Sequence, residues 1–269
     1  MAPRINSSRD IYRVKRGAGI RKAFGGLDYT RCVEYPAILD RLELGTATRL
    51  LEVGASKLFL APYIAVRHNM EVHAIDQDPA VELQRKWITS LGYGDLLHSG
   101  QFNVAQEDAT TLRYPDESFD RVVSISTIEH IKAVEDAARE IGRVLRPGGL
   151  AGLTVPFSTA FREVYVQHDL YGRRFTGTPL FYEYVFDRIS LKRSVIEPSG
   201  LTVRSLTFLG EPALKLSRLV YSPVIGRALS LCRWIWPWVA QWFLKPINEQ
   251  AVTDGDESIA VLVLVKPTQ

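Results

Sequence analysis

Acidic side chains follow three successive apolar segments of the sequence, at the points where strands are expected to end. The segment RLLEVGAS (49–56) contains Glu52 and Gly54, HAID ends in Asp76, and QED ends in Asp108. Asp76 lies 22 residues after Gly54 (76 minus 54), close to the spacing at which an acid accepts hydrogen bonds from ribose hydroxyls. A carboxylate at Asp108 can accept from an adenine amino group. The three positions together predict a site for a cofactor that contains a nucleoside.

These residues lie in an alternation of strand-like and helical segments. Strands are expected at RLLEVG, EVHAID, FNVAQED, FDRVVSIS and LAGLTVPF, and helices at segments such as PAVELQRKWITSLG and VEDAAREIGRVL. This alternation predicts an α/β, Rossmann-like, doubly wound fold, with a mostly parallel sheet covered by helices on both faces. Ligands bind such sheets beyond the carboxyl ends of the strands, so the strand ends named above should form one site.

The sequence after residue 157 has a different character. Residues 158–187 are rich in aromatic side chains without a clean period, and we expect a loop with short helices there. RISLKRSVIEPSG predicts a helix, and LTVRSLTFLG and SIAVLVLVKP predict the last two strands. Between these strands, residues 211–257 form a helical, Trp-rich insertion of unusual length for a connection.

Charge and cysteine content limit the possible function classes. The 33 Lys and Arg residues slightly outnumber the 30 Asp and Glu residues, and the excess gathers in residues 1–25. We interpret this segment as a basic N-terminal arm, followed by one domain over 26–269. Such an arm can contact nucleic acid or anionic lipid, but most are solvated and mobile. Two distant cysteines and no apolar leader predict a cytoplasmic protein without a zinc motif.

At this point the sequence resembles a known family. LLEVGAS, VHAIDQDP, EDATTLRYPDESFDRVVSISTIEHI and IGRVLRPGGLAGLTVP, over about residues 48–156, are similar to class I S-adenosylmethionine-dependent methyltransferases of the small-molecule, type 11-like kind. The resemblance implies S-adenosylmethionine as cofactor and a seven-stranded sheet whose last strand is antiparallel. It places the methionyl part at the first turn, the ribose at the second strand end and the adenine at the third. The implied cofactor-binding residues are Glu52, Gly54, Ala55, Ser56, Asp76, Gln77, Asp108, Ala109 and Ser126, with Arg31 as a candidate partner of the methionyl carboxylate or, equally, a surface arginine.

The sequence departs from the family pattern in two places. The first turn is commonly E-x-G-x-G-x-G, and here it reads E-V-G-A-S-K-L, with Ser56 and Leu58 in place of glycines. Some quinol O-methyltransferases of the family carry E-x-x-E-H, which binds a metal ion. This chain has Glu129 and His130 but lacks the first glutamate. One carboxylate and one histidine make a poor site, so we predict no metal.

Methyl transfer to oxygen or nitrogen removes a proton from the acceptor, so a general base helps. The candidates are His130, after the fourth strand, and His168 with Asp169, within the segment that follows the fifth strand. The alternative for His130 is a structural role at the start of a helix. His168 and Asp169 are adjacent in sequence, which does not by itself make them interact.

The Trp-rich segment 229–247, LSLCRWIWPWVAQWFLKPI, holds four of the five tryptophans. Trp234, Trp238 and Trp242 recur at every fourth position and predict one helical stripe. The apolar run is near the lower limit of about 17 residues for a membrane span, and Arg233 and Pro237 interrupt it. Three interpretations stay open: a helix buried against the core, a helix at the inner face of an anionic membrane, or one wall of a pocket for an apolar substrate.

The predicted activity is therefore methyl transfer from S-adenosylmethionine to a small-molecule, glycan or lipid-linked acceptor. The alternative is a catalytically inactive methyltransferase-like module that binds a membrane or an assembly partner, supported by the altered glycine turn. Nucleic acid is a disfavoured partner, because SISTIEH stands where an N-P-P-Y-type motif would hold a base. The oligomeric state stays open.

Overall fold

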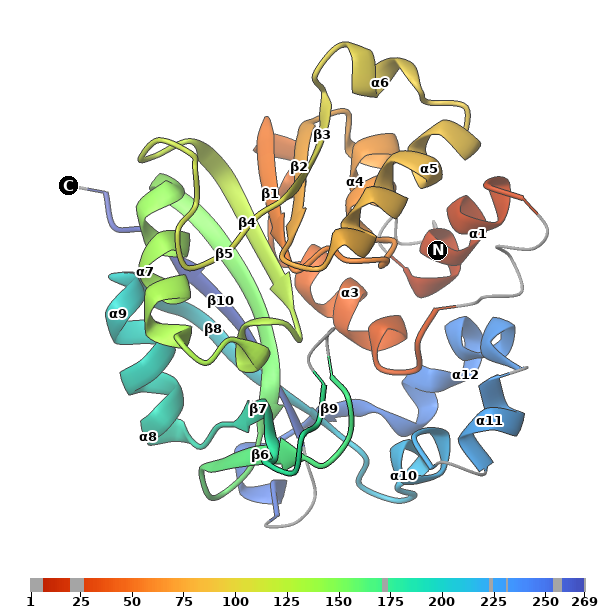
Figure 1. The fold of residues 1–269 in the computed structure, drawn as a ribbon, viewed down its shortest axis with the longest axis vertical. Coiled ribbons are helices and arrows are strands. Elements are labelled where there is room, and N and C mark those ends of the chain that lie inside the picture. The colour runs from red at the N-terminus through yellow and green to blue at the C-terminus, as the bar shows by residue number, and fades with distance from the viewer. Residues whose placement is uncertain are drawn as a thin grey trace.

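A central eight-stranded sheet organises the molecule (Figure 1). In a computed structural model, residues 7–19, 27–170, 174–222, 225–230, 232–253 and 258–268 are described. The strand order is β3-β2-β1-β4-β5-β10-β8-β9. β1 to β5 run parallel, and β10 runs antiparallel to both β5 and β8. The strands are β1 Arg49–Val53, β2 Glu71–Asp76, β3 Phe102–Gln106, β4 Phe119–Ile125, β5 Leu145–Phe157, β8 Thr202–Gly210, β9 Lys245–Ile247 and β10 Ser258–Val265.

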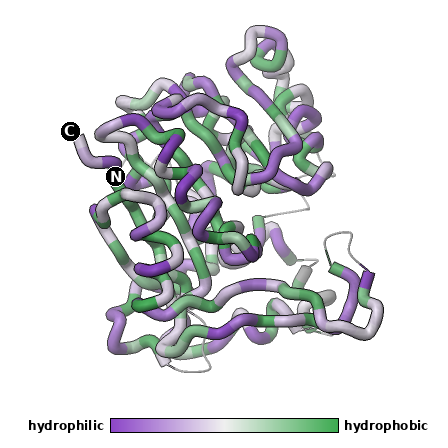
Figure 2. The backbone as a smooth tube through the Cα atoms, turned by 60° about the vertical axis from the view of Figure 1, so that its left-hand side comes forward, coloured by the Kyte–Doolittle hydropathy of each residue, from purple (hydrophilic) through white to green (hydrophobic). Residues whose placement is uncertain are grey.

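This architecture confirms the Rossmann-like fold with an antiparallel last strand. Seven strands correspond to those predicted, and the short edge strand β9, paired with β8, adds an eighth from within the insertion. Neighbouring residues of β1 enter different apolar clusters on the two faces of the sheet, Leu50 in one and Leu51 in the other. Burial on both faces explains why the strands are continuous apolar runs, and hydrophobic residues recur along the central strands in Figure 2.

Helices cover both faces of the sheet (Figure 1). One cluster includes residues of α3, α4 and α12, and the other includes residues of α7 and α8. Among the described residues up to 200, the α-helices are α1 Ser8–Gly17, α3 Arg31–Leu39, α4 Leu60–His68, α5 Leu83–Ser90, α6 Asp95–His98, α7 Val134–Val144, α8 Arg188–Leu191 and α9 Glu197–Ser199. A π-helical turn over Lys192–Ile196 joins the last two.

The N-terminal helix α1 packs on the rest of the molecule. Ile11 and Tyr12 are buried, and the Ser8 hydroxyl donates to the carbonyl of Pro237 at 2.9 Å. The Tyr12 ring meets Trp238 edge-on, with centroids 5.3 Å apart. The described part of the basic segment is thus a docked helix and not a solvated arm, because it carries an apolar face. Residues 1–6 and 20–25 of that segment lie outside the described residues, and the division at residue 25 stays a prediction.

Residues 158–187 do not form the loop with short helices that the sequence suggested. β6 Arg162–Val166 and β7 Leu180–Val185 pair antiparallel as a separate hairpin. Aromatic contacts help to explain the strands: Tyr165 of β6 meets Phe181 of β7 at 5.8 Å between centroids, and within β7 Phe181 meets Tyr184 at 4.7 Å. A bridge between Phe157 and Phe186 attaches the hairpin to the carboxyl end of β5.

The insertion between β8 and β10 is largely helical. It contains α10 Leu216–Val220, α11 Ile225–Ser230, a 3₁₀ turn over Arg233–Ile235 and α12 Trp236–Phe243. α12 buries Trp236 and Ala240, whereas Trp234, Trp238 and Trp242 of the predicted stripe are 46%, 37% and 62% exposed. Among the described residues, no helix has the length and apolar character needed to cross a membrane.

Candidate active site

The carboxyl ends of β1, β2, β3 and β4 lie side by side at one edge of the sheet, as the strand order requires. The residues that follow these ends are Gly54, Asp76, Asp108 and Ser126, in that chain order. The structure therefore brings together the strand-end residues that the sequence singled out, at the edge where ligands bind in such folds.

The turn after β1 has the tight geometry of a cofactor-binding turn despite its single glycine. Gly54 has φ +84°, and a Cβ at this position would lie 2.1 Å from the side chain of Thr127, so only glycine fits. The amides of Gly54 and Ala55 both donate to the carbonyl of Ile75 at 2.9 Å. Ser56 adopts φ +36°, in the left-handed region that glycine usually supplies. Ser56 thus retains the backbone shape expected of the second glycine.

Gln84 of α5 hydrogen-bonds to the backbone of this turn. Sequence reasoning did not identify this residue. Its buried Nε2 donates to the carbonyls of Ala55, Ser56 and Leu58 at 2.8–3.0 Å. The available signal was a polar residue in the apolar stripe of α5, one turn before the buried Ile88. A buried amide in such a stripe usually has specific partners.

Glu52 supports the start of α4. Its Oε2 accepts from the amide of Ala61 at 2.7 Å, in the first turn of that helix. Burial raises the pKa of Glu52 from its ordinary 4.5 to about 8, although the Ala61 amide acts in the opposite direction. The contact that the structure shows for this side chain is thus with the first turn of α4, the helix that follows the turn after β1.

Asp76 and Asp108 present carboxylates at neighbouring strand ends. Asp76 Oδ1 accepts from the amide of Asp78 at 2.7 Å, and burial raises the pKa of Asp76 above its ordinary value. Asp108 is exposed, and its Oδ1 accepts from the amide and hydroxyl of Thr110 at 2.9 and 2.8 Å. Gln77 is also exposed and reaches Asp108 Oδ2 at 3.4 Å, while Ala109 is buried next to it.

Arg31, the first residue of α3, reaches the end of β4. Its Nη1 donates to Glu34 and, at 2.8 Å, to the hydroxyl of Ser126. Glu34 is fully buried and also accepts from Ser126 and Thr154, both at 2.7 Å. Burial favours the neutral form of Glu34, but Arg31 and these hydroxyl groups together hold the pKa of Glu34 below its ordinary value. Arg31 is therefore a fixed cation within the site, and its Nη2 has no hydrogen-bond partner among the described residues.

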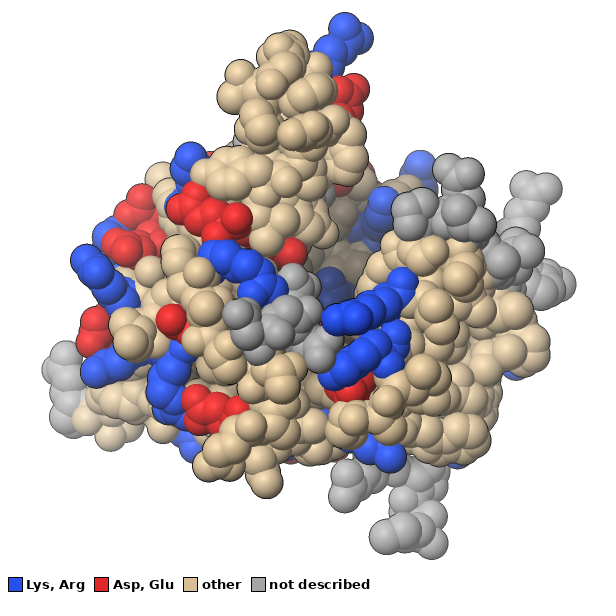
Figure 3. All heavy atoms as spheres, turned by 90° about the horizontal axis from the view of Figure 1, so that it is seen from below, with Lys and Arg blue, Asp and Glu red and all other residues tan. Residues whose placement is uncertain are grey.

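A cavity of about 600 Å³ opens beside Arg31 and Ser126. The insertion and β10 form its far walls, with Glu211, Pro212, Lys215 and Arg218 on one side and Leu244, Ile247 and Ile259 on another. Figure 3, which views the molecule from below, shows Lys and Arg side chains flanking a recess on this face. The cavity thus combines apolar walls with ionisable groups of both signs, since Asp28, Glu183 and Glu211 line it as well.

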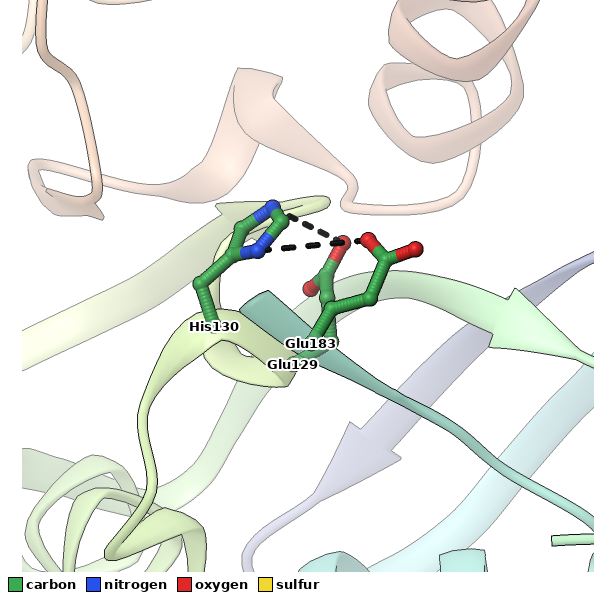
Figure 4. Close-up of side chains that lie close together, drawn as sticks. All are labelled: Glu129, His130 and Glu183. Carbon is green, nitrogen blue, oxygen red and sulfur yellow. Dashed lines mark ion pairs between the residues drawn. The ribbon is translucent and has the colours of Figure 1, made fainter. Parts of the chain in front are cut away.

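The turn after β4 brings His130 to this cavity, together with Glu129 and Glu183 (Figure 4). His130 Nδ1 lies 2.8 Å from the carbonyl of Tyr182, so Nδ1 carries the hydrogen and Nε2 carries the lone pair. Burial, with a further contribution from Arg31, lowers the pKa of His130. A neutral imidazole at this position can accept a proton from a bound molecule.

His168 and Asp169 lie elsewhere. Both are exposed on the segment after β6, and Asp169 accepts from the amide of Phe175 at 2.8 Å. Neither is among the described residues that line the cavity. The structure therefore groups His130 with the cofactor candidates and leaves His168 and Asp169 apart, so a base role for that pair stays a prediction. Tyr35, one turn from Arg31, is buried in the core.

The residues present fit the cofactor that the resemblance implies. The turn at Gly54 allows close approach of a ligand to the backbone, Asp76 and Asp108 offer acceptors for ribose hydroxyls and an adenine amino group, and Arg31 offers a cation for a carboxylate. The cavity adjoins these groups, because Arg31 also lines it, so a second molecule can lie next to the cofactor.

Comparison with known proteins agrees with this geometry. A family model described as "Methyltransferase domain" matches residues 51–153. An O-methyltransferase of Pyrenophora dematioidea is 31% identical over 112 residues, which is 41% of this chain and 40% of that protein. The ubiquinone/menaquinone biosynthesis C-methyltransferase of Hahella chejuensis is 28% identical over 138 residues, 45% of this chain and 52% of that protein. The chain thus spans about half or less of the length of these relatives.

A solved structure extends the similarity of fold to the whole chain. Phosphoethanolamine N-methyltransferase 2 of Haemonchus contortus, in complex with S-adenosyl-L-methionine, aligns over 99% of this chain and 59% of its own length, with a TM-score of 0.52 at 15% identity. At that identity, the likeness concerns the fold.

Proposed function

The chain belongs to the class I S-adenosylmethionine-dependent methyltransferases, with S-adenosylmethionine as its cofactor, and from this premise we propose that it methylates an amphipathic, lipid-linked small molecule. One observation carries the proposal. Arg31 and Ser126, two of the cofactor candidates, also line the cavity of about 600 Å³ that continues toward the insertion. This volume lies in the range of small-molecule sites, roughly 300–1,000 Å³.

The cofactor supplies an electrophilic methyl group, and the protein's task is to align it with the acceptor and exclude water. Asp76 and Asp108 hold the nucleoside, and Arg31, fixed by Glu34, pairs with the methionyl carboxylate. His130, which lines the cavity, accepts at Nε2 the proton that an acceptor hydroxyl or amine releases. These roles are assigned from position and chemistry.

The walls of the cavity favour an acceptor with an apolar body and a polar or charged group. Leu244, Ile247 and Ile259 provide apolar surface, while Lys215 and Arg218 provide positive charge and Glu183 and Glu211 carry carboxyl groups. The name of the Hahella relative, which refers to ubiquinone and menaquinone biosynthesis, fits a lipid-like acceptor. A hydrophilic glycan would leave the apolar wall in contact with polar groups, which is unfavourable.

We assign the exposed tryptophans a role in reaching such an acceptor. Trp234, Trp238 and Trp242 stand out from the insertion that also forms the cavity wall. Tryptophan rings beside basic residues are suited to the headgroup boundary of an anionic membrane. Segment 229–247 would then hold the cavity close to the membrane surface where the acceptor resides.

Calorimetric titration with S-adenosylmethionine tests the cofactor site. The wild-type chain should bind, and Asp76→Asn should bind at least about tenfold more weakly, because removal of one charged hydrogen-bond partner costs roughly 1.5–3 kcal/mol. Asp95→Asn, on α6 away from the strand ends, is the matched control and should bind as wild type does. No heat with the wild-type chain would refute the proposal and support the inactive-module alternative.

Methyl transfer from labelled cofactor to a membrane lipid extract tests the acceptor class. Label should enter the organic phase with the lipid extract and not with a water-soluble glycan mixture. Co-sedimentation with anionic vesicles should fall severalfold for Trp242→Ala and stay unchanged for Tyr93→Ala, an exposed aromatic residue outside the insertion. Equal vesicle binding by all three proteins would refute the membrane role.

A further inference from the structure

Three side chains able to ligate a metal ion meet beside the cavity: Glu129, His130 and Glu183 (Figure 4). One ligand atom from each lies within 4.8 Å of the other two. His130 Nε2 is 3.9 Å from Glu129 Oε1, and His130 Nδ1 is 3.9 Å from Glu183 Oε2. Glu129 and His130 belong to the turn after β4, and Glu183 belongs to β7, so two distant parts of the chain form the cluster.

Glu129 is an unusual residue in this cluster. Its side chain is 1% exposed, and its Oε2 has no hydrogen-bond partner among the described residues. A buried carboxylate without a full set of partners is unfavourable, and most buried polar atoms in folded proteins are paired. A cation held between Glu129 and its neighbours would supply the missing interaction.

The orientation of His130 is that of a metal ligand. Its Nδ1–H donates to the backbone carbonyl of Tyr182 at 2.8 Å, which fixes the orientation of the ring and places the lone pair on Nε2. Metal-binding histidines almost always donate their other ring N–H to a carbonyl or carboxylate in this way. The Nε2 atom also faces Glu129 Oε1, the closest carboxylate oxygen of that residue.

We propose that Glu129, His130 and Glu183 bind a first-row divalent cation, such as Mn²⁺ or Zn²⁺. Carboxylates suit Mn²⁺, and an imidazole in the set favours transition metals over Mg²⁺. Ligand atoms at about 2.1 Å from one cation are roughly 3–3.5 Å apart. The two glutamate side chains therefore need to move inward by about an ångström, which small rotations about their χ angles allow.

The sequence expectation of no metal site considered Glu129 and His130 alone. Glu183 lies 53 residues after His130 (183 minus 130), on a hairpin that the sequence did not predict. Three protein ligands leave coordination positions for water and for an acceptor oxygen, whose proton a bound cation makes easier to remove. With the cation bound, His130 Nε2 is a ligand and cannot also accept the acceptor's proton, so in that state the cation takes the place of His130 as the activating group. This catalytic role rests on the proposed function, whereas the binding site itself does not.

Titration of the full chain with Mn²⁺, followed by electron paramagnetic resonance in the absence of S-adenosylmethionine, tests the site. The wild-type chain should bind one Mn²⁺, Zn²⁺ should displace it, and Glu183→Gln and Glu129→Gln should each weaken binding at least about tenfold. Glu163→Gln removes a carboxylate from β6 of the same hairpin, outside the cluster, and should bind as wild type does. Circular dichroism of each variant verifies that it is folded.

The outcomes separate the cation site from the methyltransferase proposal. Absence of Mn²⁺ and Zn²⁺ binding to the wild-type chain at millimolar concentration overturns the inference, even if S-adenosylmethionine binds. Equal affinity of wild type and a folded Glu183→Gln variant also overturns it. Binding that depends on Glu183 and Glu129 supports the site, even if no methyl transfer is found.

Discussion

The buried carboxyl of Glu52 makes the stability of the protein depend on pH, and Glu52→Gln should remove that dependence. Burial raises the pKa of Glu52 from 4.5 to about 8. The folded protein therefore keeps a proton on this group that the unfolded chain releases above about pH 4.5. The stabilisation that this proton contributes is fully present below the pKa that Glu52 has in the unfolded chain. It is lost as the pH rises through the pKa that Glu52 has in the folded protein.

The expected magnitude follows from these two values. One pKa unit corresponds to about 1.4 kcal/mol, so the change from 4.5 to about 8 amounts to roughly 5 kcal/mol over the whole range. Between pH 6 and pH 8 the free energy of unfolding should fall by about 2 kcal/mol through this group alone. Glutamine has nearly the same shape, keeps an acceptor for the Ala61 amide and does not ionise.

Urea unfolding of both proteins at pH 6 and pH 8, without cofactor, measures the effect. If the difference in unfolding free energy between wild type and Glu52→Gln is the same at both pH values, that difference reflects packing. A change of this difference between pH 6 and pH 8 reports the ionisation of Glu52. Glu82→Gln, which changes an exposed carboxylate, should follow the wild-type pH dependence. If the unfolding free energies of wild type and Glu52→Gln changed equally between pH 6 and pH 8, the assignment of a raised pKa to Glu52 would be refuted.

Further predictions concern the turn after β1 and the ion pair behind it. Gly54→Ala and Gly92→Ala both place alanine at φ near +85°, but only a side chain at position 54 would meet Thr127. In urea unfolding, the free energy of unfolding should therefore fall by about 3 kcal/mol for Gly54→Ala and by about 1 kcal/mol for Gly92→Ala. Equal losses would contradict the contact with Thr127. Gln84→Leu leaves three carbonyl groups without their donor and should lower the unfolding free energy by about 2 kcal/mol, with weaker cofactor binding in the same thermal-shift series; an unchanged melting temperature would be inconsistent with this role. Glu34→Gln should cost about 3 kcal/mol at pH 7 because Arg31 loses its buried partner. Since the pKa of folded Glu34 is lowered below its ordinary 4.5, this loss should be complete above that value and shrink as the pH falls below it, which unfolding at a series of pH values from 7 down to about 3 measures.

The positions of Gly54, Asp76 and Asp108 at neighbouring strand ends could be predicted from the sequence because that information is local. Each of Gly54, Asp76 and Asp108 follows a strand whose apolar run is visible in the sequence, and parallel strands bring their carboxyl ends to one edge. The left-handed conformation of Ser56 was not predicted, because residues other than glycine seldom adopt it.

The acceptor side could not be predicted in the same way because its contacts join distant parts of the chain. The β6–β7 hairpin depends on cross-strand aromatic pairs, such as Tyr165 with Phe181, which leave no simple period. Glu183 becomes a neighbour of His130 only when that hairpin docks. α1 was misjudged because its basic charge is conspicuous, whereas its burial depends on two residues, Ile11 and Tyr12.

The position of the cavity wall, on segments outside β1 to β5, has a consequence for how such a protein can change. The insertion leaves β8 and returns to β10, which are neighbours in the sheet, and the hairpin leaves β5 and returns beside its end. Residues can be added to or removed from either excursion without moving the register of β1 to β5. Substitutions and length changes there can alter which molecule is accepted, while Gly54, Asp76 and Asp108 keep their places.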